Sequence, residues 1–258
     1  MGHERVGLLP RRRRWNQVVE RIAVASERHE EMGSLATNVL RNVRDRYAHV
    51  HADTGVEAAF GFLIGLTSGD RPRPEGAHYV PEVHLAENPS PLQLAYKLQQ
   101  WVEKNRQSGE YATLAKSAAA DVVSRWTAKL ARQPSMFEDN YTAAAVWRSA
   151  SSGSGFCEVA RLFFAKFTER YLNYFIEREA SAQTRSIERR RLFSVALGRH
   201  IDDVSNHAFE TSKIAQSFAA GWYNRYASQK VPSDKEITRF LKRCFAKLSE
   251  ELLREQTQ

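Results

Sequence analysis

The sequence contains little of what several protein classes require. Its 258 residues include two cysteines, Cys157 and Cys244, which are too few for a disulfide framework or a four-cysteine zinc site. Thirteen glycines and eight prolines are few for an all-β protein, because such folds need many tight turns. Apolar runs are short, and none reaches the length of about 18 residues typical of a membrane-spanning helix. These absences favour a helical protein that does not enter a membrane.

Targeting and catalytic motifs are also missing. The first residues, MGHERVGLLPRRRRWN, contain no uninterrupted apolar core of the kind that a secretory signal needs, which predicts a cytoplasmic protein. The chain has no P-loop, dinucleotide-binding glycine fingerprint, HExxH motif, nucleophile elbow or kinase signature. We therefore predict no cofactor, and the leading interpretation is a non-enzymatic role.

Positive charge is abundant. Lysine and arginine total 38 against 30 acidic residues, for a net charge of +8, and 28 of the 38 are arginines. A guanidinium group matches the geometry of phosphate and carboxylate oxygens better than an ammonium group does. The excess predicts a partner that is nucleic acid or an acidic protein. A GC-rich genome would also raise the arginine content, and the sequence leaves that alternative open.

Apolar residues recur at helical spacing through most of the chain, and no segment alternates for long enough to require a strand. We predict an all-α fold, a multi-helix bundle divided into a basic arm (1–14), an N-terminal helical region (15–67), a proline-rich connection (68–91) and a C-terminal helical bundle (92–258). The connection holds five of the eight prolines, and its apolar residues Tyr79, Val80, Val83 and Leu85 suggest that part of it packs. Whether 15–67 and 92–258 form one continuous domain is left open.

Individual segments carry more specific predictions. Residues 56–66 are apolar nearly all round and are expected to be buried, while the aromatic-rich helix over 156–175 is expected at the centre of the bundle. One long helix is predicted over 197–222, and the run SASSGSG at 149–155 is expected to be a flexible hinge or loop. Ser90-Pro91 and the capping box from Ser233 to Glu236 predict two helix starts.

Arg44 and His49 are separated by four residues, and a polar residue follows the arginine. This spacing resembles the motif of HEPN ribonucleases, which are all-α. The resemblance implies that Arg44 would stabilise a phosphate while His49 moves a proton during RNA cleavage. A HEPN-like nuclease is therefore an alternative function. The competing interpretation is a solvated helix end.

A second alternative is a metal-assisted nuclease. His200, Asp203, His207 and Glu210 are spaced by three, four and three residues, so on a helix they would share one face. Two imidazoles and two carboxylates are suitable ligands for a divalent metal. His49 with His51 and a distant carboxylate is a further possible set of ligands. A hydrated helix face and a polar turn are the respective competing interpretations.

Basic residues gather in clusters that are predicted to neutralise phosphates. Aromatic residues stand close to these clusters in the sequence, which is typical of proteins that bind single strands by stacking. The predicted role is therefore a subunit that binds nucleic acid or docks within a larger bacterial assembly, for example one used in defence. A helical adaptor for an acidic protein is a third alternative, and a solvated basic face is the competing interpretation. The predicted nucleic-acid-binding residues are Arg11, Arg12, Arg13, Arg14, Arg185, Arg189, Arg190, Arg191, Arg239, Lys242 and Arg243.

Overall fold

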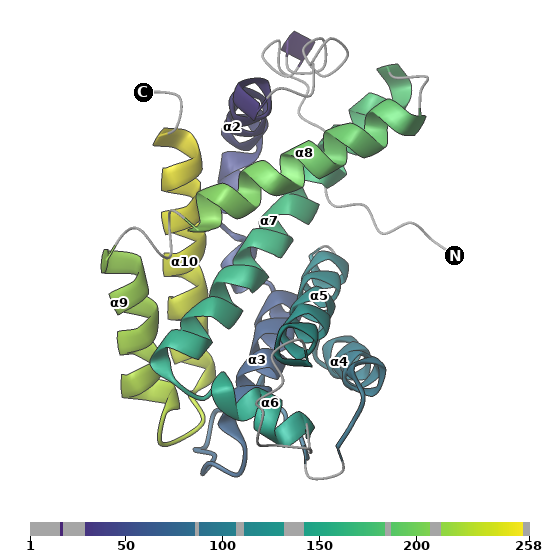
Figure 1. Ribbon diagram of the computed structural model, residues 1–258. Helices are drawn as coiled ribbons and strands as arrows, with labels where there is room; N and C mark the ends of the chain where they lie inside the picture. The colour runs from purple at the N-terminus through teal and green to yellow at the C-terminus, as the bar shows by residue number, and fades with distance from the viewer. Residues whose placement is uncertain are drawn as a thin grey trace.

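The computed structural model describes residues 16–17, 29–85, 88–106, 111–131, 142–183, 187–206 and 213–254. Across these ranges the chain is mostly helical and contains no strand, which confirms the predicted all-α bundle (Figure 1). The elements are α2 (His29–Tyr47), η1 (Val50–Ala52), α3 (Thr54–Ser68), α4 (Pro91–Asn105), α5 (Ala112–Ala131), α6 (Ala143–Ser149), α7 (Gly153–Gln183), α8 (Ile187–Asn206), α9 (Lys213–Trp222), η3 (Tyr223–Ala227) and α10 (Asp234–Arg254).

Helix α7 runs through the middle of the bundle, as the aromatic pattern predicts. It packs against α5 on one side and α9 on the other, and α8 crosses it (Figure 1). Six of its aromatic side chains are fully buried, and they cover more than one face of the helix because neighbours surround it. They are Phe156, Phe163, Phe164, Phe167, Tyr171 and Phe175.

Helix α3 is the second buried helix. Asp53 precedes it, and its carboxylate accepts hydrogen bonds from the backbone N–H groups of Gly55 (2.9 Å) and Val56 (3.1 Å). This cap satisfies two donors that have no partner inside the helix. Every residue from Gly55 to Ser68 is buried, which confirms the prediction from the apolar pattern over 56–66.

The proline-rich connection packs against α3 along part of its length, as its apolar residues suggest. Val80 and Val83 are buried. A Cβ atom on Gly61 would lie 2.1 Å from the carbonyl oxygen of Tyr79, and one on Gly65 would lie 2.7 Å from that of Pro81. The two glycines, one helical turn apart, therefore let the backbone of the connection lie directly on α3.

The connection also holds the elements that follow in the C-terminal part of the chain. The guanidinium group of Arg71 donates to the carbonyl oxygens of Thr67 and Ala227, both at 2.9 Å. Asp234, the first residue of α10, accepts from the backbone N–H of Tyr79 (3.0 Å) and pairs with His78 (2.8 Å). The end of η3 and the start of α10 are thus both attached to one loop.

Two sequence-based expectations differ from the structure. The predicted helix over 197–222 is two helices, α8 and α9. The predicted flexible hinge or loop at 149–155 is a shorter loop than expected, because α6 ends at Ser149, α7 begins at Gly153, and the Ser151 hydroxyl donates to the carbonyl of Thr67 (2.6 Å). Gly153 and Gly155 belong to the first turn of α7, because tertiary contacts can override the low helix propensity of glycine.

Both predicted helix starts are confirmed. Ser90 and Gln93 form a capping box at α4 with Pro91 in the first turn. At α10 the Glu236 carboxylate accepts from the backbone N–H of Ser233 (2.7 Å). Within the described ranges, no helix combines the length and the apolar character needed to cross a membrane.

Candidate nucleic-acid interface

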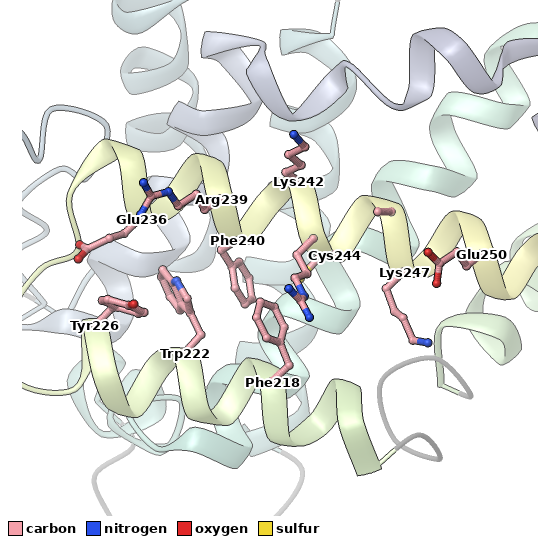
Figure 2. Close-up of a pocket in the computed structure, with 12 residues that line it drawn as sticks. Phe218, Trp222, Tyr226, Glu236, Arg239, Phe240, Lys242, Cys244, Lys247 and Glu250 are labelled. Atoms are coloured by element: carbon pink, nitrogen blue, oxygen red, sulfur yellow. The ribbon is translucent and has the colours of Figure 1, made fainter.

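Helices α9 and α10 lie side by side at one edge of the molecule, with large aromatic side chains between them (Figures 1 and 2). Phe218, Trp222 and Tyr226 follow one another at intervals of one helical turn and point toward α10, and Phe240 points back from α10 (Figure 2). The ring of Phe240 lies 4.4 Å from that of Trp222 and 5.7 Å from that of Phe218, centroid to centroid. Their bulk keeps the two helices apart.

The space that remains is a groove of about 720 Å³. Its floor is formed by Phe240 and Trp222, which are almost completely buried, whereas Phe218 and Tyr226 are half-buried and border the opening. A groove of this size with aromatic walls accommodates planar or apolar groups of a ligand.

Cations from α10 line the same groove. Arg239 and Arg243 are exposed, and the guanidinium carbon of Arg243 lies 5.2 Å from the ring centroid of Phe218. Among the described residues neither arginine has a carboxylate within ion-pair distance. Lys247 is half-buried and pairs with Glu251 (3.1 Å). The two arginines therefore keep their charge available for an external anion.

Carboxylates stand near both ends of the lining segment. Glu236 lies in the first turn of α10 and Glu250 in its last third, and both line the groove (Figure 2). Glu236 also serves the capping interaction with Ser233. The unpaired positive charge of the groove thus lies between these carboxylates, at Arg239 and Arg243.

Tyr226, one of the aromatic residues of the groove, lies in an irregular turn. Residues Tyr223–Ala227 form a π-helical turn, in which the backbone N–H of Ser228 bonds to the carbonyl of Tyr223 (2.8 Å). Such turns are rare and occur frequently at functional sites. The turn follows α9 directly and contains Tyr226, and the guanidinium carbon of Arg225 lies 5.2 Å from the centroid of that ring.

The predicted nucleic-acid-binding residues are distributed unevenly. Arg239, Lys242 and Arg243 come together at the groove, although the ammonium group of Lys242 points away from the aromatic side chains (Figure 2). Arg191 is exposed on α8, a different helix, which also carries Arg189 and Arg190. The arginines at 11–14 and 185, together with the side chains of 189 and 190, lie outside the described part of the chain.

The predicted HEPN-like pair lies at the end of α2 and in the turn that follows it. Arg44 belongs to the last turn of α2, but its side chain is outside the described atoms, and His49 is exposed in the turn after α2. Of the neighbouring residues, His51 is hydrogen-bonded to the Ala48 carbonyl (2.8 Å) and Asp53 caps α3. Burial lowers the pKa of His51, and the charge of Lys242 lowers it further. The nuclease function stays a prediction.

The predicted metal-binding face is described only in part. His200 is buried in the bundle, whereas Asp203 on the same helix is exposed. His207 and Glu210 lie outside the described residues. Within the described ranges, no group of three or more histidine, cysteine or acidic side chains is placed to hold a metal ion. Metal binding at this face also stays a prediction.

The groove itself was not predicted from the sequence. The aromatic residues of α9 and the cations of α10 each follow a helical period, and the spacing of Phe218, Trp222 and Tyr226 was a visible signal. That spacing is equally typical of side chains buried in the core, because the period alone does not show which neighbour covers a helix face.

No model of a known protein family matches this chain, and no curated protein or solved structure is significantly similar to it.

Proposed function

We propose that the chain binds nucleic acid, without acting on it chemically, through the groove between α9 and α10. The observation that carries the proposal is the combination of two unpaired arginines with half-buried aromatic rings in one groove. Guanidinium groups contact phosphates, and aromatic rings contact bases or sugars. A solvated basic face would not require rings at the same place.

The chain acts in this proposal as a subunit of a larger assembly. Arg239 and Arg243 are four residues apart on α10, which is roughly 6 Å along the helix axis. A contact of that length covers few nucleotides and gives modest affinity by itself. Linked subunits that bind the same strand would raise the affinity through their effective concentration.

Binding is tested by titrating the full chain against a fluorescent oligonucleotide at several salt concentrations. We expect the logarithm of the binding constant to fall linearly with the logarithm of the salt concentration, because each contacted phosphate releases counterions. Arg243→Ala should weaken binding about tenfold at low salt and reduce this slope by about one. Lys242→Ala should cost less, because its ammonium group points away from the rings.

The matched control is Arg125→Ala. Arg125 is also an exposed arginine within a helix, but it belongs to α5, which does not line the groove. Its removal changes the net charge by the same amount and should leave the salt slope unchanged. Equal losses for Arg125→Ala and Arg243→Ala, or no binding by the unmodified chain, would contradict the proposal.

A further inference from the structure

The accessible rings of the groove distinguish between paired and unpaired nucleic acid. Phe218 and Tyr226 lie on either side of Trp222 and border the opening of the groove. In a duplex each base face is covered by the neighbouring base pair, so a protein ring reaches base faces only where the strand is unpaired. The rings of the groove can therefore stack on the bases of a single strand, whereas an intact duplex offers them no base face.

The arginines beside these rings support the same conclusion. Arg225 lies over Tyr226 and Arg243 over Phe218, each with its guanidinium carbon 5.2 Å from the ring centroid. Each ring therefore accepts a planar group on one face, which the guanidinium group of an exposed arginine now occupies and an unpaired base could take in its place. Unpaired bases stack both on aromatic rings and on guanidinium planes. Each ring–arginine pair thus offers a stacking surface next to a positive charge.

The carboxylates limit what else fits. Glu236 and Glu250 line the groove near the two ends of the positive segment. A duplex carries one phosphate charge per about 1.7 Å of its axis and is rigid over the length of this site. A duplex laid along α10 would bring phosphates against these carboxylates. A flexible single strand can contact the arginines and turn away before it reaches either carboxylate.

We infer that the ligand of the groove is single-stranded nucleic acid, with unpaired bases stacked at Phe218 and Tyr226 and phosphates held by Arg239 and Arg243. This inference rests on the proposed function and names its substrate class. RNA and DNA share the required chemistry, since both supply free base faces and phosphates. The contacts recognise no particular base, because every base has a face that stacks.

The test compares three labelled probes on the full chain at one salt concentration. They are an oligo-uridine and an oligo-thymidine of about 12 nucleotides each, and a duplex of the same length. We expect at least one single strand to bind about tenfold or more tightly than the duplex, and the stronger of the two identifies RNA or DNA as the natural source. Equal or tighter binding of the duplex overturns the inference and leaves the proposed function standing. Failure of all three probes to bind overturns the proposed function itself.

Two substitutions separate stacking from folding. Tyr226→Ala should weaken single-strand binding about tenfold, the typical effect of losing one stacked base, whereas Tyr226→Phe keeps the ring and should retain the affinity. Loss of affinity in Tyr226→Phe at unchanged helicity overturns the stacking role. The double variant Glu236→Gln, Glu250→Gln should improve duplex binding more than single-strand binding, and an equal effect on both probes contradicts the role given to the carboxylates.

Discussion

At the residue scale, the buried carboxyl group of Glu57 links two distant parts of the chain. It lies on α3, is nearly inaccessible to solvent, and accepts a hydrogen bond from the hydroxyl of Thr238 on α10. Burial raises the pKa of Glu57 above its ordinary value of 4.5, and the nearby Asp234 and Asp53 raise it further. Each of these causes disfavours the charged form in the folded state.

We predict that Glu57→Gln changes the pH dependence of stability. Between the unfolded pKa near 4.5 and the raised folded pKa, the folded protein binds more protons at Glu57 than the unfolded chain does. The free energy of unfolding therefore falls as the pH rises through this window. Glutamine keeps an acceptor for Thr238 and does not titrate, so the variant should lack this decline. Urea unfolding at several pH values measures it, and parallel curves for the two proteins would contradict the assignment.

At the element scale, the first part of the proline-rich connection, residues 70–85, places the candidate site. It lies on α3, bonds to the end of η3 through Arg71, and bonds to the start of α10 through Asp234. The backbone N–H of Val231 adds a further bond to the carbonyl of Pro72 (2.9 Å). The separation and register of α9 and α10 therefore depend on how closely this loop approaches α3.

We predict that Gly61→Ala destabilises the fold by about 1–3 kcal/mol, because the new methyl group would displace the backbone at Tyr79. Gly221→Ala is the control, since a Cβ atom there meets no atom of the described residues within 4 Å and alanine favours the helix by up to about 1 kcal/mol. Thermal unfolding should shift in opposite directions for the two variants. Shifts of the same sign would show that the close approach at Gly61 does not govern stability.

At the scale of the whole molecule, one hydrophobic core joins the helices on both sides of the connection. It includes Val39 on α2, Leu98 on α4 and Leu252 on α10. Phe60 lies at its centre, with ring centroids 5.2 Å from Phe163 and 5.5 Å from Phe240. Helices that are far apart in the sequence thus bury their apolar side chains in the same core when the chain folds.

We predict that Phe60→Ala lowers the free energy of unfolding by about 3–5 kcal/mol and moves the transitions seen by far-UV circular dichroism and by tryptophan fluorescence equally. Equal shifts are expected because a shared core unfolds as one unit. Leu92→Ala, at a side chain that is 80% exposed, should change stability by less than about 0.5 kcal/mol. Separated transitions in Phe60→Ala would instead indicate that 15–67 and 92–258 unfold as independent domains.

The apolar periodicity of the sequence predicted the helices well where their position depends on residues close together in the chain. Four features depend only on residues within a few helical turns of one another. They are the apolar run of α3, the aromatic stripe of α7, and the helix starts at Ser90 and Ser233. The break between α8 and α9 was missed because apolar residues continue in phase across it. The candidate site was missed for a related reason. Helices α9 and α10 follow one another in the chain, but the way their side chains face each other depends on residues 70–85, more than 130 residues earlier.

The sequence by itself determined that this chain folds as helices, which of them are buried, and that it carries an excess of positive charge. Only the tertiary structure decided which charges remain available. Arg170 pairs with Asp121 at 2.6 Å and Arg161 with Asp202 at 3.2 Å, whereas Arg239 and Arg243 face the groove without such a partner among the described residues. The physical reason is that helix formation depends on neighbours along the chain, while ion pairing and ring exposure depend on neighbours in space.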